Sequence, residues 1–389
     1  MARLARVEVF AADEIAVVHV MNRTVRRCFL FGSDNVTKRN YDHRKQWLDD
    51  LLVQLAKYFA IDLLSSAILS NHFHLLLRSR PDAVKQWSDT EVAWRWLMLC
   101  PRQRDSQRQP IEPTEFEINR IVNNPEKLAT IRSRLSDISW WMRLLSQHIA
   151  QRANKEEGET GKFFQARYRA VRMLDEAAIA ACSAYIDLNP IRSGIAQSIE
   201  TSDHTSAQKR SCDLQAKAIA AIIESAVAQA TPATQATPAP TEIRTESTQP
   251  TPTRPDYARH LSPIDLQEST KTPGPDLHVA GDRCSNKGFL PMSTEKYLKL
   301  LEWTANQIVY DRYDKTEPRP PEVDPFLNQL GLNESTWCAL VRDFGRLFSL
   351  VAGKPHLIAT YQPALKAQST PPNHRHRARL QLRELFSRQ

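Results

Sequence analysis

Two histidines, two positions apart, are the first residues in this sequence whose types and spacing could do chemistry. His72 and His74 flank Phe73 in HFHLLLRS, residues 72–79, a run that predicts a β-strand. Side chains two apart on a strand project from the same face, roughly 6–7 Å apart, so both imidazoles could bind one divalent ion. One surface histidine and one packed histidine would give the same pattern. The pair alone therefore leaves a metal site and a structural role open.

A tyrosine and an asparagine form a second candidate pair. Residues 176–188, EAAIAACSAYIDL, predict a helix with Asp175 as its N-cap, and Tyr185 and Asn189 would share one face of it. A phenol can attack phosphorus and form a covalent intermediate, and an amide oxygen is a suitable ligand for Mg²⁺ or Mn²⁺ beside two imidazoles. Alternatively, Tyr185 packs in the core and Asn189 ends the helix, because Pro190 disfavours helical conformation in the residue before it.

Basic side chains mark the segment that precedes this helix. Residues 162–174, KFFQARYRAVRML, alternate and predict a strand with one buried face and one basic face. Arg167 and Arg169 on the basic face are candidates for contacts with phosphates, and simple solvation is the alternative. Lys162, Arg172 and Arg192 are further DNA-binding candidates with less support, since isolated basic residues are usually solvated.

The elements that must position these residues follow the order β-α-β-β-α-β-α. We predict strands over residues 15–22, 62–70, 72–79 and 162–174, and helices over residues 43–59, 131–155 and 176–188. This order fits an α+β fold, a ferredoxin-like or RRM-like split βαβ with an antiparallel sheet, helices on one face and the other face open. An open sheet suits single-stranded nucleic acid, although a fold alone does not specify a function.

Composition divides the chain into four parts. Residues 1–205 form the predicted first domain, with a hydrophilic insertion at about 81–128. Residues 206–288 are predicted to be a largely disordered linker, because Ala, Thr, Pro and Gln dominate its middle. Residues 289–355 regain helical periodicity as a small unit, and 356–389 form a basic tail. Within the small unit, FLNQLGLN at 326–333 indicates a helix-turn-helix or a plain helical hairpin.

Charge and motifs limit the classes of function. The 389 residues carry a net charge of +8, which favours a polyanionic partner such as nucleic acid. GETGK at 158–162 lacks the first glycine and the hydroxyl residue of a phosphate loop, which argues against an ATPase. The six cysteines form no CxxC pair, and we find no signal peptide and no apolar run of membrane-spanning length. We therefore expect a cytoplasmic, nucleoid-associated protein with no membrane contact.

Four segments, in order, resemble the HUH single-tyrosine (insertion-sequence-200-like) transposases. HVMNR at 19–23 is similar to their first strand, H-V-x-N-R, and NHFHLLL at 71–77 resembles their NHxHLLL strand. GKFFQARY at 161–168 resembles G-x-[FLW]-[FW]-Q-x-R-[YF]. YIDLNPIR at 185–192 resembles the Y-[IV]-x-x-N-P-[VI]-[RK] segment of the REP-associated tyrosine transposases. The resemblance covers roughly residues 12–200 and does not extend to 205–389.

The resemblance implies a transposase that cleaves and rejoins single-stranded, hairpin-containing DNA through a 5′-phosphotyrosine. Tyr185 would be the nucleophile, and His72, His74 and Asn189 would hold Mg²⁺ or Mn²⁺. The spacing departs from the family, because 185 − 74 = 111 residues separate His74 from Tyr185, and the C-terminal extension is long. Both departures leave substrate choice open, and also whether the site forms within one chain or across a homodimer.

A second class of function remains beside this one. A non-catalytic DNA-binding regulator derived from a transposase would keep the basic sheet and lose the chemistry. The presence of both histidines, the tyrosine and the asparagine disfavours such decay. A replication initiator or relaxase is a third hypothesis, with less support from the segment at 185–192.

Overall fold

The structure is a computed structural model, and it describes most of the chain. The described residues are 13–34, 38–107, 109–230, 257–266, 274–309, 320–321, 323–361, 382 and 384–386. The Ala/Thr/Pro-rich part of the predicted linker and most of the predicted basic tail lie outside them. Within the described part, no helix is long and apolar enough to cross a membrane.

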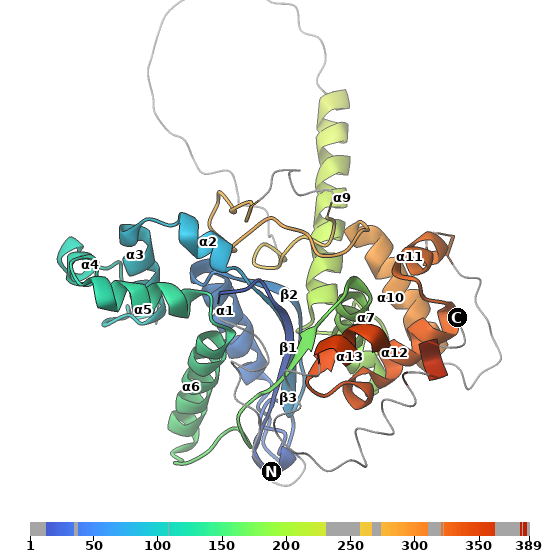
Figure 1. The fold of residues 1–389 in the computed structure, drawn as a ribbon, viewed down its shortest axis with the longest axis horizontal. Coiled ribbons are helices and arrows are strands. Elements are labelled where there is room, and N and C mark those ends of the chain that lie inside the picture. The colour runs from blue at the N-terminus through green and yellow to red at the C-terminus, as the bar shows by residue number, and fades with distance from the viewer. Residues whose placement is uncertain are drawn as a thin grey trace, which may run out of the picture.

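One five-stranded sheet forms the centre of the molecule, in the order β2-β3-β1-β4-β5. Strands β1 (Val17–Arg23), β2 (Ile61–Ile68), β3 (His72–Ser79) and β4 (Arg169–Met173) pair antiparallel, and β3 lies between β1 and β2. Strand β5 (Val351–Ala352) extends the sheet by pairing parallel to β4. The predicted α+β class is confirmed (Figure 1).

Two long helices cover one face of the sheet. Alternate residues of β1 and β3, such as Val18 and Leu75, point toward α1 (His43–Tyr58) and α6 (Ile138–Glu157), and all of them share one apolar core. Trp141 of α6 is fully buried in this core. The helix predicted over 131–155 is therefore shifted, because a separate helix ends at Leu135 and α6 begins at Ile138.

The predicted insertion at 81–128 is helical. It contains α2 (Pro81–Gln86), α3 (Asp89–Leu99), α4 (Glu115–Val122) and the start of α5 (Pro125–Leu135). Ser88, Thr114 and Asn124 each accept a hydrogen bond from a backbone N–H in the first turn of the helix that follows, and so act as N-caps. These helices extend to one side of the sheet (Figure 1).

Helices also cover the second face, so the prediction of an open face is wrong. α7 (Glu176–Asp187) lies against β2, β3 and β4, and α12 (Glu334–Leu347) packs on α7. The reason is that this face is apolar as well: Leu76 of β3 and Val171 of β4 are buried in a second core with the alanines of α7. The short helix α8 (Asn189–Arg192) follows α7.

The segment predicted as a small helical unit, 289–355, is not a separate domain. Its helices α10 (Thr294–Val309), α11 (Val323–Leu330) and α12 share the second core with α7. The hydroxyl of Tyr297 on α10 donates to the carboxylate of Asp187 on α7 over 2.7 Å. The helix α13 (Pro355–Tyr361) follows β5 and takes the first residues of the predicted tail.

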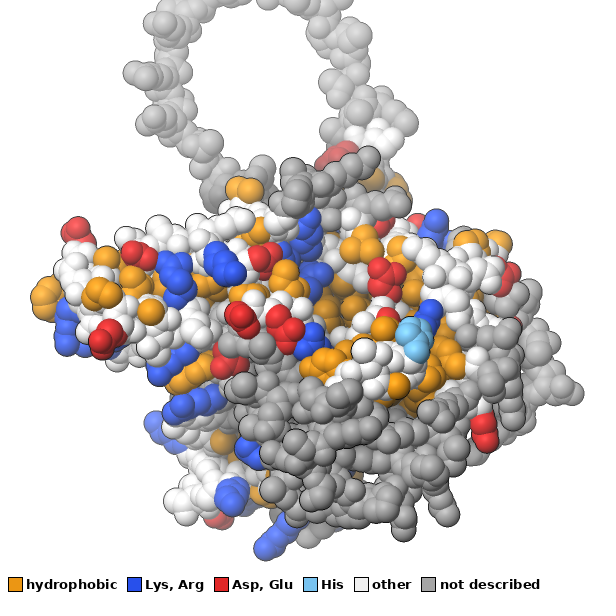
Figure 2. All heavy atoms as spheres, viewed as in Figure 1, with side chains coloured by type: hydrophobic (Ala, Val, Ile, Leu, Met, Phe, Trp, Pro, Cys, Tyr) orange, Lys and Arg blue, Asp and Glu red, His pale blue; other side chains and the backbone are white. Residues whose placement is uncertain are grey.

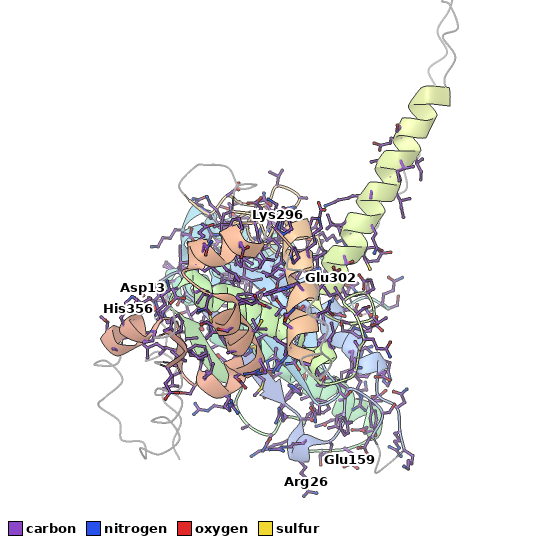
Figure 3. All side chains as sticks on the ribbon, turned by 90° about the vertical axis from the view of Figure 1, so that its right-hand side faces the viewer. Asp13, Arg26, Glu159, Lys296, Glu302 and His356 are labelled. Atoms are coloured by element: carbon purple, nitrogen blue, oxygen red, sulfur yellow. The ribbon has the colours of Figure 1, made fainter. Side chains whose placement is uncertain are left out.

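Much of the described part of the predicted linker is also ordered, contrary to expectation. Residues from 206 form α9 (Ser206–Ala230). The hydroxyl of Ser206, its first residue, donates to the carboxylate of Asp187 over 2.5 Å. The helix then projects away from the sheet (Figures 1 and 3). Further along, Leu261 forms an isolated parallel β-bridge with Leu63 of β2. The hydroxyl of Ser285 donates to the carboxylate of the buried Asp62. The carboxylates and carbonyls of the first domain therefore anchor this segment.

Candidate functional site

Three histidines meet on the face of the sheet that α7 covers. β3 places His72 and His74 two residues apart, with ring centroids separated by 5.0 Å. On the neighbouring strand β1, Met21 pairs with His74, and His19 lies two residues before Met21 on the same face of the sheet. His19 is therefore next to the histidines of β3. The rings of His19 and His74 are stacked at 5.1 Å, and Nε2 of His19 lies 2.8 Å from Nδ1 of His74. The structure thus places His19 in direct contact with His74.

Burial keeps these imidazoles uncharged. His74 is 2% exposed, and burial is the main reason that its pKa lies well below the usual value. Burial, assisted by the charge of Arg23, lowers the pKa of His72 to about 4. Burial, assisted by Arg169, lowers the pKa of His19 to about 3. Neutral imidazole is the form that binds metal ions, so all three rings are in the binding form near neutral pH.

Tyr185 reaches this cluster from the second face. Asp175 caps α7 by accepting from the backbone N–H of Ala178 over 2.7 Å. In the last turn of the helix, the ring of Tyr185 meets that of His74 edge-on, with centroids 5.5 Å apart. Burial raises the pKa of the phenol, and the charge of Arg192 acts in the opposite direction. The phenol is therefore protonated near neutral pH and must lose its proton to act as a nucleophile.

Asn189 is not seen in contact with the histidines. It begins α8 directly before Pro190, and it is 9% exposed. Its carbonyl accepts from the N–H and the hydroxyl of Ser193, and no contact described for its side chain involves His72 or His74. Among the described residues, no group of three or more His, Cys, Asp or Glu side chains is arranged to hold a metal ion.

The pair His72 and His74 nevertheless has ring nitrogen atoms that could bind a metal ion. Nε2 of His74 is buried and has no hydrogen-bond partner. A buried polar atom without a partner costs on the order of 1–3 kcal/mol, and a divalent cation would relieve that cost. Nδ1 of His72 lies 2.6 Å from Oδ1 of Asn71, which leaves the second ring nitrogen of His72 for another partner. These two residues therefore fit a cation of the kind that imidazole binds.

Two of the five basic residues predicted to bind DNA lie at this site. The guanidinium of Arg192 lies over the ring of Tyr185, 4.7 Å from its centroid, and donates to the carbonyl of Arg342. Arg169 extends from β4 toward the same place and donates to the carbonyls of Gly345 (3.3 Å) and Phe348. Both cations are therefore held near Tyr185 by the C-terminal end of α12.

The other three basic residues lie elsewhere. Arg172 forms an ion pair with Glu14 over 2.5 Å and a hydrogen bond with the hydroxyl of Tyr361 over 3.1 Å. Figure 3 shows the neighbouring Asp13 and His356 on the same side of the molecule. Lys162 and Arg167 are both exposed. They lie in the segment before β4, because the strand predicted from residue 162 begins only at Arg169. Figure 2 shows further Lys and Arg side chains over α2 to α6, interspersed with acidic groups.

The C-terminal end of α12 covers Tyr185. The ring of Phe344 lies 5.6 Å from that of Tyr185 and 6.2 Å from that of His19. A Cβ atom on Gly345 would lie 2.8 Å from the phenol oxygen, so only glycine fits there without displacing the tyrosine. A pocket remains between the cover and the sheet, lined by His19, Met21, His74, Arg169, Val171, Tyr185, Phe344, Gly345 and Phe348.

The residues of this cover were not predicted from the sequence. The apolar spacing of Trp337, Leu340, Val341 and Phe344 indicates that α12 must bury one face. Nothing in the spacing identifies the element that this face meets. The buried face of α12 contacts α7 and α10 within the chain, and the choice between a helix-turn-helix and a plain helical hairpin for α11 and α12 stays a prediction.

Comparison with known proteins gives a distant likeness to a solved structure. No protein-family model matches the sequence, and no curated protein matches it. Among solved structures, the chain is similar to a REP-associated tyrosine transposase bound to a REP hairpin, with 12% sequence identity and a TM-score of 0.30. The matched region covers 53% of this chain and 82% of that one. A TM-score this low does not assign the chain to that family.

Proposed function

We propose that this protein is a metal-assisted transposase that cleaves and rejoins single-stranded, hairpin-containing DNA, built on a ferredoxin-like split βαβ. The observation that carries the proposal is the contact between Tyr185 and His74, whose rings meet at 5.5 Å from elements far apart in the sequence. A tyrosine beside two neutral histidines, one buried and one partly buried, combines a nucleophile with metal-binding donors.

Tyr185 performs the covalent step. Its phenol oxygen attacks phosphorus, the new O–P bond forms as the bond from phosphorus to the 3′-oxygen breaks, and the phenol proton ends on that oxygen. The products are a 5′-phosphotyrosine and a free 3′-hydroxyl. Attack by a 3′-hydroxyl on the phosphotyrosine reverses the bond changes and rejoins DNA, so no nucleotide is consumed.

His72 and His74 would hold Mg²⁺ or Mn²⁺, with Asn189 as the third ligand after a change in its side-chain position. Such a cation supplies Lewis-acid polarisation of the scissile phosphate. The buried, partnerless Nε2 of His74 supports this assignment, because a buried polar atom needs a partner.

Arg169 and Arg192 would bind the phosphates that flank the scissile bond. Their guanidinium groups donate hydrogen bonds to backbone carbonyls of α12. A phosphate could replace these carbonyls as the acceptor. The net charge of +8 supports a DNA partner. A DNA strand reaches the phenol oxygen only after Phe344 and Gly345 move away from it.

The same cover favours a second candidate function, a non-catalytic DNA-binding regulator derived from a transposase. In that case, α12 would be a permanent part of the core, and Tyr185 would be a packed residue. The two functions differ in one product: the transposase forms a covalent protein–DNA adduct, and the regulator does not.

The test is to incubate the full chain with labelled single-stranded hairpin DNA and Mn²⁺ and to separate adducts on a denaturing gel. We expect an adduct from the unmodified protein and none from Tyr185→Phe. Circular dichroism and the unfolding midpoint establish that this variant is folded. An adduct of equal yield from Tyr185→Phe would exclude Tyr185 as the nucleophile. Salt-sensitive DNA binding without an adduct, with either metal, would favour the regulator.

A further inference from the structure

Two residues next to the histidine pair determine which ring nitrogens are available. We infer that Asn71 and His19 are positioning residues, which fix the rings and tautomers of His72 and His74 so that the second nitrogen of each can bind a divalent cation. The inference rests on the proposed metal-binding function. It assigns a role to two side chains that the proposed chemistry does not use.

The orientation of the Asn71 amide is decided by its neighbour on the other side. Nδ2 of Asn71 donates to the carbonyl of Arg27 over 3.1 Å, so Oδ1 is the atom that faces His72. Oδ1 lies 2.6 Å from Nδ1 of His72, and an amide oxygen only accepts hydrogen bonds. Nδ1 of His72 must therefore carry the proton. In the neutral ring, Nε2 then has a free lone pair.

The backbone around Asn71 holds this geometry in place. The carbonyl of Asn71 accepts from the N–H and the hydroxyl of Thr24, each over 3.0 Å. Arg26 and Arg27 both have a positive φ, 51° and 61°, a conformation that non-glycine residues adopt at a cost of about 1 kcal/mol or more. The turn that presents the Arg27 carbonyl to Asn71 is therefore held by its surroundings.

His19 has the corresponding relation to His74. Nε2 of His19 and Nδ1 of His74 are 2.8 Å apart, so one of the two carries the shared proton. If His74 donates, its Nε2 keeps a lone pair. If His19 donates, Nε2 of His74 carries a proton that points at no acceptor, because this atom is buried and has no partner. Only the first arrangement lets a cation satisfy the atom.

Hydrogen bonds of this kind commonly orient metal-binding histidines. A partner on the second nitrogen fixes the tautomer and raises the basicity of the ring, and its removal typically lowers metal affinity about 10–100-fold. The stacking of the His19 and His74 rings, at an interplanar angle of 18°, also restrains rotation of His74. Both histidines of the pair therefore have one nitrogen held and one nitrogen free.

The experiment measures Mn²⁺ binding to the full chain by calorimetry. His19→Phe keeps an aromatic ring against Tyr185 but removes the acceptor, and Asn71→Leu removes the amide oxygen. We expect each to weaken Mn²⁺ binding by about 10–100-fold. His19→Gln places an amide oxygen near the original position of Nε2, and we expect it to restore most of the affinity. His148→Phe, a half-buried histidine on α6, is the matched control and should bind Mn²⁺ normally.

Imidazole ¹⁵N NMR of the metal-free protein gives a second readout that does not depend on Mn²⁺. We expect both His72 and His74 to be protonated at Nδ1, and this preference to be lost at His72 in Asn71→Leu and at His74 in His19→Phe. Protonation at Nε2, or unchanged Mn²⁺ affinity in both variants, overturns the positioning roles. Failure of the unmodified protein to bind Mn²⁺, with the Nδ1 tautomers intact, instead overturns the proposed metal site.

Discussion

Phe344 lies against Tyr185, with ring centroids 5.6 Å apart and ring planes inclined by 33°. Phe344 is 1% exposed, so the aromatic surface of Tyr185 on this side is shielded by apolar contact. The neighbouring Gly345 lies close to the phenol oxygen itself. The residue proposed to attack DNA is therefore covered by a helix from the other end of the chain.

Removal of the Phe344 ring is expected to uncover Tyr185. Phe344→Ala should speed the formation of the protein–DNA adduct, because the strand no longer has to displace a buried ring. It should also lower the free energy of unfolding by about 3–5 kcal/mol, the usual cost of a buried Phe→Ala change. Both quantities are measured on the full chain, with the adduct assay run well below the unfolding temperature.

Phe326→Ala separates uncovering from general loosening. Phe326 on α11 is also buried, at 4% exposure, and packs against Trp337 on α12. It is not among the residues that line the pocket beside Tyr185. We expect it to destabilise the protein comparably and to leave the rate of adduct formation unchanged. Equal acceleration in both variants would mean that lost stability, and not exposure of Tyr185, controls the rate.

Arg192 should contribute to DNA binding where Arg172 does not. Arg192 lies over the ring of Tyr185, whereas Arg172 is paired with Glu14. Arg192→Gln should reduce the slope of log affinity against log salt concentration by about one phosphate contact, that is by ~0.7–0.9. Arg172→Gln should leave the slope unchanged. Equal reductions, measured by fluorescence anisotropy with hairpin DNA, would show that overall charge and not position determines binding.

Stability should fall in acid because of buried neutral histidines. Burial, assisted by Lys209, lowers the pKa of His260 to about 3, from an ordinary value of 6.5. Between these values the unfolded chain binds a proton that the folded chain does not. The stabilising contribution is therefore complete above pH 6.5 and is lost progressively as the pH falls toward 3, by up to about 1.4 kcal/mol per pH unit for each such residue.

His260→Leu should make this loss shallower. The free energy of unfolding is measured with denaturant at pH 7, 6 and 5 in the presence of a chelator, so that metal binding does not contribute. His356→Leu, at an exposed position on α13, is the control and should keep the pH dependence of the unmodified protein (Figure 3). A slope that His260→Leu does not change would contradict the assignment of His260 as a buried neutral group.

The sequence predicted the chemistry-bearing elements because their signals are local. Alternation places His72 and His74 on one strand face, and Asp175 marks the start of the helix that carries Tyr185. Each of these patterns spans a few residues, and the order of the elements was sufficient to predict the α+β class. The boundaries were less accurate at β4, where the regular ladder with β1 is limited to Arg169–Arg172.

Contacts between distant segments could not be predicted from such patterns. The second sheet face appeared open because no local pattern shows which face α7 packs on, and α12, which packs on α7, follows a long segment of low apolar content. Asp187 illustrates the same point: its partners Ser206 and Tyr297 come from two later helices, and no spacing in the sequence connects them. The position of Asn189 relative to the histidines likewise depends on how Pro190 directs the chain, which a helical repeat does not describe.

The parallel pairing of β5 with β4 limits how the protein can be shortened. The N–H groups of Arg172 and Leu174 donate to the carbonyls of Leu350 and Ala352, so the outer edge of β4 is closed by residues near the end of the described chain. A fragment that stops before α12 would expose Tyr185, but it would also leave an unpaired edge strand, and such edges promote aggregation. Point substitutions in α12 are therefore the safer way to open the site, and insolubility of a truncated protein would say nothing about its catalytic competence.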